Sequence, residues 1–384
     1  FTNSGLTGRQ MQAKAKNMLY DWFVTFRKEG FTEWNSSPYL PIDTLGFGSL
    51  YAFAQDPAMR ELGREGMDFA YYLLAVHSQQ GIFASSSGRT YIKEQFGNWS
   101  NCPSGLSWIG YGYGVPGHAG KGITSYCLSD YEPPKELAQW FSIPRGKEMI
   151  CQTTQGNDGY VDLYTYKTAD YMMTSANDFH PGEPGHQENP FQLTFNAVAQ
   201  LWVTHPGERV LFGAARPSYW AGNGTLPKVN QYKAFAGLIY DIAPEHPVDF
   251  THLYLPSMEF DRCEVEGKWA FVQLGSAYAA VYCSNGMRMQ DFGSNKDREC
   301  IAEGRRCIWL VRAAQADEFA AFEDFKAAMR GAALDADAEG RRYRFVDPVY
   351  GELRCQWGET LYVNDAPMQY SGFDNYGKLT MQEK

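Results

Sequence analysis

The sequence predicts an α+β protein in which helices come first and antiparallel sheets follow. Apolar side chains recur at steps of three and four in the first part of the chain, which is typical of helices. From Glu148 onward, β-branched and aromatic residues alternate between Gly and Asn-Gly turns, which indicates strands. The 384 residues, 44% of them hydrophobic, suffice for two domains with separate cores. We therefore expect one domain over residues 1–147 and another over residues 148–384.

Three helices are expected before the glycine-rich middle of the chain. Residues 8–28 place their apolar side chains on one helical face, namely Met11, Ala15, Met18, Leu19, Trp22, Phe23 and Phe26. A second helix is expected over residues 42–54. Asp56 and Pro57 then give the start of a third helix that runs to about Ser78, because Asp is a good N-cap and Pro suits the first helical position. This rhythm predicts an all-α bundle or toroid.

These helices are too few to close a toroid and would leave an apolar face uncovered. The chain also starts at Phe1, without an initiator Met. We therefore expect further helices to precede Phe1 in the full protein. Residues 1–147 would then be part of an (α/α) toroid.

The rest of the chain is expected to contain mostly strands. Residues 81–146 are rich in Gly and aromatic residues, with a short helix expected near residues 134–141. Strands are expected at residues 160–166, 268–274 and 277–282, among others. A helix is expected over residues 317–330, where Phe recurs at helical spacing. The pattern predicts an antiparallel β-sandwich after the helices.

Composition argues against several classes of partner and cofactor. The net charge is -10, with 34 Lys and Arg against 44 Asp and Glu, so a nucleic-acid partner is not expected. No apolar run is long enough to span a membrane. The chain has no P-loop and no Gly-x-Gly-x-x-Gly after a strand, so we expect no nucleotide cofactor. Eight Cys without a Cys-x-x-Cys pair permit disulfides, and we expect a secreted or periplasmic protein.

Aromatic residues make up 15% of the chain, which leaves two interpretations open. Aromatic rings stack on the faces of sugars, but they also form cross-strand pairs in the cores of β-sheets.

Two polar loops, at residues 30–39 and 85–91, carry motifs that resemble those of the heparinase II/III-like polysaccharide lyases. The motifs are Glu33-Trp34-Asn35-Ser36 and Gly88-Arg89-Thr90-Tyr91. In that family an Asn or His on a toroid loop is followed along the chain by a catalytic Tyr. Here Asn35 and Tyr91 are 56 residues apart (91 minus 35). Further likeness lies at residues 171–178, 185–188 and 267–272, so the resemblance implies an incomplete (α/α) toroid followed by an antiparallel β domain.

The resemblance implies a polysaccharide lyase that acts on a uronic-acid glycan by β-elimination. Asn35 would neutralise the substrate carboxylate and so stabilise the enolate-like charge next to it. Tyr91 would act as base and acid, with its pKa lowered by a cation such as Arg89. Some relatives place a His beside or at the Asn position, whereas here Ser36 follows Asn35, which favours Tyr91 as the base. The alternative is structural: Asn35 caps a turn and Tyr91 packs beneath it.

The family also implies a histidine from the β domain that faces the cleft. His186 is preferred over His180 within the polar loop at residues 179–188, because such loops often display functional side chains. His77 is expected to be structural, His205 a turn residue and His118 a secondary candidate. The expected catalytic residues are Asn35, Tyr91 and His186. Substrate-binding roles are expected for Trp34, Tyr39, Arg89, Glu94 and His180.

The expected partner of the lyase is an acidic polysaccharide. Two other functions remain open as alternatives to a lyase. A glycoside hydrolase on a similar toroid would use two carboxylates from among Glu33, Asp43, Glu94 and Glu188. A carbohydrate-binding protein without catalysis would use the aromatic residues alone. His186, Glu188 and Asp178 lack the spacing of a zinc site, so we expect no metal and no other cofactor.

Overall fold

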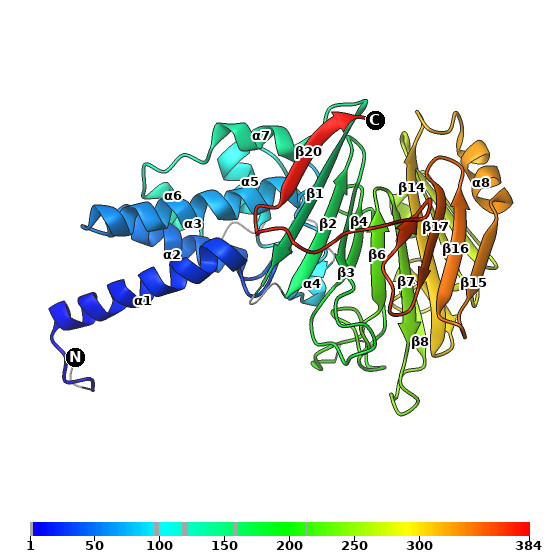
Figure 1. Ribbon diagram of the computed structural model, residues 1–384, viewed down its shortest axis with the longest axis horizontal. Coiled ribbons are helices and arrows are strands. Elements are labelled where there is room, and N and C mark those ends of the chain that lie inside the picture. Colours follow the sequence, from blue (N-terminus) through cyan, green and yellow to red (C-terminus); the bar gives the residue numbers. More distant parts are fainter. Residues whose placement is uncertain (1–2, 96–99, 117–121, 157–159, 212) are drawn as a thin grey trace.

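The computed structural model describes residues 3–95, 100–116, 122–156, 160–211 and 213–384. It has an α+β architecture in which helices precede three antiparallel sheets (Figure 1), as the sequence predicts. The helices are α1 (Gly8–Glu29), α2 (Leu40–Phe53), α3 (Pro57–Val76), α4 (Ile92–Gln95), α5 (Ser104–Tyr111), α6 (Ile123–Cys127), α7 (Ala138–Phe141) and α8 (Phe322–Gly331).

Helices α1 and α3 begin where local chemistry predicts, and α2 begins at Leu40, two residues before the expected start. Thr7 and Gln10 form a capping box at the start of α1, in which each side chain accepts a hydrogen bond from the other residue's backbone N–H. The Asp56 side chain accepts a 3.0 Å hydrogen bond from the backbone N–H of Ala58, and Pro57 is the first residue of α3. The helices expected over residues 8–28 and 42–54 are therefore confirmed, and so is the start of the third.

Helix α8 begins at Phe322, so the start expected at residue 317 is wrong. The backbone N–H groups of Glu318 and Phe319 both donate to the carbonyl of Gln315, at 2.9 and 3.3 Å. These residues thus form a turn at the end of the preceding strand, and the helix starts only after it.

The nine-stranded sheet has the order β12-β13-β8-β5-β4-β3-β2-β1-β20. Its strands are β1 (Lys147–Gln155), β2 (Val161–Lys167), β3 (Met172–Asn177), β4 (Phe191–Thr194), β5 (Gln200–Thr204), β8 (Phe250–Tyr254), β12 (Arg288–Met289), β13 (Glu299–Glu303) and β20 (Lys378–Glu383). Strands begin at Lys147, close to the position where the sequence pattern changes.

Two smaller sheets follow. The six-stranded sheet has the order β6-β7-β14-β11-β10-β9, with β6 (Lys228–Tyr232), β7 (Phe235–Asp241), β9 (Arg262–Glu266), β10 (Trp269–Leu274), β11 (Ala277–Cys283) and β14 (Arg306–Gln315). The five-stranded sheet contains β15 (Leu334–Asp337), β16 (Arg342–Asp347), β17 (Gly351–Gln356), β18 (Tyr362–Val363) and β19 (Ala366–Pro367). Helix α8 lies at the end of the molecule farthest from α1 (Figure 1).

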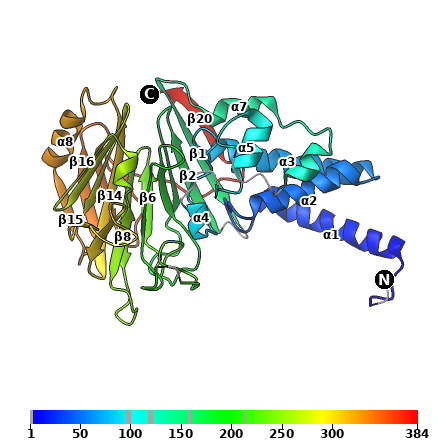
Figure 2. The same cartoon turned by 180° about the vertical axis from the view of Figure 1, so that it is seen from behind.

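The helices pack against the end of the nine-stranded sheet. Met149 and Cys151 of β1 belong to the same buried apolar cluster as the residues of α3. Lys167 of β2 is fully buried, and its ammonium donates to the carbonyls of Ala75 and Trp140, at 2.9 and 2.8 Å. Helix α4 lies where the helices meet the sheet in both views (Figures 1 and 2), so the loops around it are held between the two parts.

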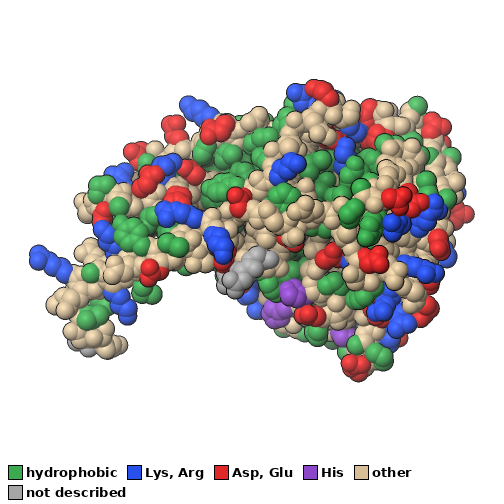
Figure 3. All heavy atoms as spheres, in the orientation of Figure 1, with side chains coloured by type: hydrophobic (Ala, Val, Ile, Leu, Met, Phe, Trp, Pro, Cys, Tyr) green, Lys and Arg blue, Asp and Glu red, His purple; other side chains and the backbone are tan. Residues whose placement is uncertain are grey.

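Basic and acidic side chains are interspersed over the face of the molecule in Figure 3.

All eight cysteines are free thiols, and six of them are buried. No helix in the described ranges combines the length and the apolar character that a membrane crossing requires.

Candidate active site around Tyr91

The two loops that carry the lyase-like motifs meet in space. One loop joins α1 to α2 and the other joins α3 to α4. The backbone N–H of Gly88 donates to the carbonyl of Trp34 at 2.9 Å, and Arg89 pairs with Glu33 at 2.9 Å. The Arg89 guanidinium also donates to the Tyr39 hydroxyl at 3.3 Å, with its carbon 4.9 Å from the centre of that ring. The second loop is therefore fixed against the first just before Tyr91.

The nine-stranded sheet holds the second loop from the other side. Ser87 and Asn189 exchange two backbone hydrogen bonds, at 2.9 and 2.7 Å. Thr90 donates through its backbone N–H to the carbonyl of Gln187, and the Gln187 amide donates back to the carbonyl of Thr90 at 2.8 Å. The segment that precedes β4 thus positions Tyr91, although it lies almost a hundred residues later in the chain (187 minus 90 is 97).

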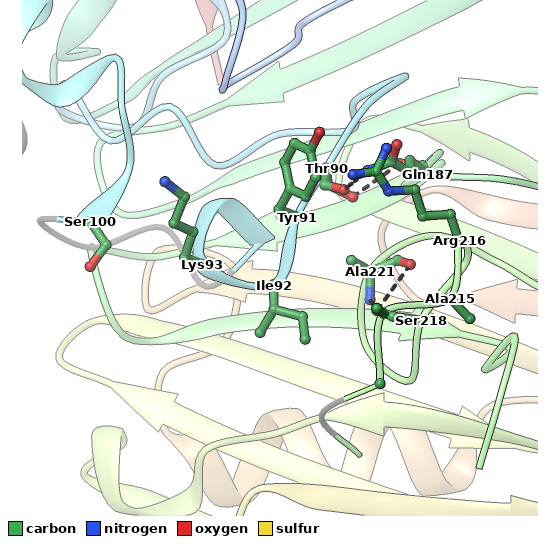
Figure 4. A pocket seen from close by; sticks show the side chains of 12 residues that line it. Thr90, Tyr91, Ile92, Lys93, Ser100, Gln187, Ala215, Arg216, Ser218 and Ala221 are labelled. Carbon is green, nitrogen blue, oxygen red and sulfur yellow. Dashed lines mark hydrogen bonds between the residues drawn. The ribbon is translucent and has the colours of Figure 1, made fainter. Parts of the chain in front are cut away.

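Tyr91 lies on the wall of an open cavity of about 680 Å³. Lys93 and Arg216 lie on opposite sides of the Tyr91 ring in the view of Figure 4. A second cavity, of about 290 Å³, also has Tyr91 and Lys93 in its wall. The first cavity is lined by Thr90, Tyr91, Ile92, Lys93, Ser100, Gln187, Gly213, Ala214, Ala215, Arg216, Ser218 and Ala221.

Arg216 connects Tyr91 to His186. The Arg216 guanidinium carbon lies 5.1 Å from the centre of the Tyr91 ring, and His186 Nδ1 lies 3.2 Å from the Arg216 carbonyl oxygen. His186 is exposed and lies in the segment that precedes β4. The structure therefore places His186 next to Arg216, although among the described residues the walls of the two cavities beside Tyr91 include neither His186 nor Arg89.

Cations lower the pKa of Tyr91 below its usual value near 10.0. The largest cause is the interaction of the phenol with the Arg89 guanidinium, and the positive charge of Arg216 acts in the same direction. Partial burial opposes the shift but does not cancel it. A tyrosine with a lowered pKa forms phenolate more readily, which suits a general base.

Asn35 lies beside this region but does not face the open cavity. Its side chain is 2% exposed and its backbone has a φ of 47°. The amide nitrogen donates to the carbonyl of Ser86 at 3.3 Å, the amide oxygen has no partner among the described residues, and Asn35 lines a small separate cavity. In this conformation the Asn35 amide is not directed at a ligand beside Tyr91.

Two of the expected substrate-binding residues lie elsewhere. Trp34 is 1% exposed, and its ring packs against Phe179 at 5.6 Å, so the indole is a core side chain with no face open to a sugar. The His180 ring contacts Tyr160 and Phe179, and neither cavity beside Tyr91 includes His180 in its wall.

The carboxylates proposed for a hydrolase are spread around the site. Glu94 lines the smaller cavity together with Tyr39, but its side chain is buried and pairs with Lys93 at 3.1 Å. Burial, together with the negative charge of Glu33, raises the pKa of Asp43 to about 7. The carboxylate of Glu188 accepts a hydrogen bond from the backbone N–H of His186.

The remaining histidines have structural surroundings where the structure describes them. His77 is buried and bonds to the Thr165 hydroxyl at 2.8 Å. His205 is also buried, with Nε2 3.1 Å from the carbonyl of Val248. His118 lies outside the described residues. Asp178 is held by Lys228 and Asn230, and the described ranges contain no group of three or more His, Cys, Asp or Glu that would bind a metal.

Sequence reasoning missed Arg216, Lys93 and Gln187. Arg216 lies in the long loop between β5 and β6, and no local pattern links it to Tyr91, because the contact depends on strand pairing. Lys93 is two residues after Tyr91, so a search for cations near the motif would have found it.

Comparisons of the chain with protein-family models, with curated proteins and with solved structures found no match.

Proposed function

We propose that this protein is a polysaccharide lyase that cleaves a uronic-acid glycan by β-elimination. The observation that carries the proposal is Tyr91, a tyrosine in the wall of an open cavity whose pKa is lowered by the cations Arg89 and Arg216. Under this proposal, residues 1–147 belong to an incomplete (α/α) toroid. The substrate is an acidic polysaccharide, and the enzyme acts in a secreted or periplasmic location.

Arg216 and Lys93 are assigned the task of binding the substrate carboxylate. Both line the cavity, and they lie on opposite sides of Tyr91 (Figure 4). A cation that binds the carboxylate stabilises the negative charge that develops when the adjacent C5 proton leaves. The sequence suggested Asn35 for this role, but the Asn35 amide nitrogen donates to the carbonyl of Ser86. We therefore assign the binding of the substrate carboxylate to the two cations.

Tyr91 is assigned the proton transfers. As phenolate it takes the C5 proton, and the electron pair of that C–H bond forms the double bond between C4 and C5. The bond from C4 to the glycosidic oxygen breaks, and this oxygen takes a proton from the phenol. His186, next to Arg216, would assist at the edge of the site. Proton transfer by a positioned side chain contributes on the order of 10²- to 10⁴-fold to the rate of such a reaction.

The carboxylates favour a lyase over a hydrolase. A hydrolase needs two carboxyl groups that face the scissile bond across a short gap. The wall of the larger cavity contains no Asp or Glu among the described residues, and the smaller cavity has only Glu94. The lowered pKa of Tyr91 suits proton transfer, which a binding protein without catalysis does not perform.

The test is incubation with a panel of uronic-acid polysaccharides, followed by ultraviolet absorbance of the unsaturated product. Arg216→Gln should lower kcat/KM by roughly 10- to 100-fold, because a charge-assisted hydrogen bond to the substrate is lost. Tyr20→Phe on α1, remote from the cavity, is the control and should keep full activity. Reducing ends without a double bond would favour a hydrolase, and bound glycan without product would favour a binding protein.

A further inference from the structure

A small cavity of about 10 Å³ lies between the two loops, α4 and the segment around β4. Polar side chains dominate its wall. A space of roughly 10–15 Å³ holds one particle of the size of a water molecule. The residues in the wall are Asn35, Ser37, Phe83, Ala84, Ser85, Ser87, Thr90, Glu94, Gln95, Asn189 and Gln192.

A chain of amides fixes which side-chain atoms around this cavity are already hydrogen-bonded. Gln200 Nε2 donates to the carbonyls of residues 196 and 197, each at 3.3 Å, so Gln200 Oε1 must accept. It accepts from Gln192 Nε2 at 2.9 Å. Gln192 Oε1 in turn accepts from Asn189 Nδ2 at 2.8 Å and from Gln95 Nε2 at 3.4 Å. The amide oxygens of Asn189 and Gln95 are therefore left facing away from this chain.

Asn35 and Glu94 add two more oxygens. Asn35 Nδ2 is committed to the carbonyl of Ser86, which leaves Oδ1 free. One oxygen of Glu94 receives Lys93 at 3.1 Å and the Cys102 thiol at 3.5 Å, and the other has no donor in the described part of the chain. Four oxygens of buried side chains thus lack a donor among the residues that the structure describes; they belong to Asn35, Glu94, Gln95 and Asn189, which are 2%, 3%, 2% and 1% exposed.

We propose that this cavity, the Glu94 cage, binds a dehydrated Na⁺ ion. All four of these atoms accept hydrogen bonds and none donates, whereas a water molecule has only two hydrogens to give. A hard cation interacts favourably with every oxygen at once, and carboxylate and amide oxygens are ligands that hard cations prefer. The Ser37 hydroxyl, also in the wall and without a partner among the described residues, supplies a fifth oxygen.

Charge and size select a monovalent ion. Glu94 is the only acidic side chain in the wall, and Lys93 already lies on one of its oxygens. With Lys93 counted, a monovalent ion leaves one net positive charge at this buried site and a divalent ion leaves two, so the divalent ion is the less favourable of the two. Mg²⁺ usually keeps several of its waters, and the cavity has room for one particle.

The ligands of this ion come from three segments that are distant in the sequence. Asn35 lies in the loop after α1, Glu94 and Gln95 lie in α4, and Asn189 lies just before β4. An ion held by all three would fasten the segment from Ser85 to Tyr91 to the sheet. The Glu94 cage would therefore order the proposed active site.

The experiment is a thermal unfolding series on the purified chain in NaCl, KCl, CaCl₂ and choline chloride at equal ionic strength. The expected result is a Tm about 2 °C or more higher in NaCl than in choline chloride, because an ion that binds only the folded state raises its stability. Glu94→Gln removes the only charge of the cage and should abolish this difference. Glu61→Gln, an exposed carboxylate that pairs with Arg64, is the matched control and should retain it.

Equal Tm values in NaCl and choline chloride would overturn the proposal and leave a water molecule as the occupant. A rise in CaCl₂ without a rise in NaCl would overturn the charge argument. If Glu94→Gln does not fold, the comparison of salts on the unsubstituted chain still decides, since it needs no variant. Because Tm measures stability and not catalysis, this experiment tests the Na⁺ site even if the protein has no lyase activity.

Discussion

Replacing Lys167 with Met should make the stability of the protein less dependent on pH. The ammonium of Lys167 is fully buried between the helices and β2, where it donates to the carbonyls of Ala75 and Trp140. Burial lowers its pKa from 10.5 to about 7. Two hydrogen bonds to backbone carbonyls do not replace the water that this charge loses.

The sign follows from proton binding. Between pH 7 and 10.5 the unfolded chain keeps the Lys167 proton while the folded chain has lost it, so stability rises with pH across this window. The shift of about 3.5 units (10.5 minus 7) corresponds to a total of about 5 kcal/mol, at 1.36 kcal/mol per unit. Between pH 7.5 and 9.5, the expected gain is about 2–3 kcal/mol.

The assay is urea unfolding at pH 7.5 and 9.5. The unsubstituted chain should gain about 2–3 kcal/mol relative to Lys167→Met over this interval, while the two chains titrate alike at all other groups. Lys147→Met, whose ammonium is partly exposed on β1, should behave like the unsubstituted chain. If Lys167→Met shows the same pH dependence as the unsubstituted chain, Lys167 is charged in the fold and the reasoning is refuted.

Two further predictions concern the loop that carries Tyr91. Arg89→Gln should move the rising limb of the pH–activity profile to higher pH, because Arg89 is the main cause of the lowered pKa of Tyr91. A profile of kcat/KM against pH measures this shift. If the rising limb stays at the same pH, a group other than Tyr91 titrates there. Gly88→Ala should cost about 1–3 kcal/mol in urea unfolding, because the added Cβ would lie 2.7 Å from Nε1 of the buried Trp34. Gly46→Ala in α2 is the control, since an added Cβ there meets no atom within 4 Å. Equal stability of the two variants would show that the loop at Gly88 shifts to accommodate the added methyl group.

The sequence was sufficient for elements with strong local signals. The N-cap at Asp56 and the apolar faces of α1 and α3 depend on residues a few positions apart, so periodicity and capping rules predict them. The start of α8 was missed because a turn at Gln315 uses the backbone groups that the helix would need.

The site was predicted only in part, because burial and long-range contacts decide it. Trp34 and Glu94 look like exposed loop residues, but the loop packs on the sheet and covers both. Arg216 reaches Tyr91 from 125 residues later in the chain (216 minus 91), and only the pairing of the strands brings it there. The orientation of the Asn35 amide likewise depends on a carbonyl of the opposite loop.

The most direct test of the lyase proposal compares the unsubstituted chain with Tyr91→Phe on uronic-acid polysaccharides, with ultraviolet absorbance of the product as the readout. We predict an unsaturated product from the unsubstituted chain and a rate on the order of 10²- to 10⁴-fold lower for Tyr91→Phe, which keeps the ring but loses the proton-transfer group. Equal rates for the two proteins, or a product without the double bond, would contradict the role assigned to Tyr91.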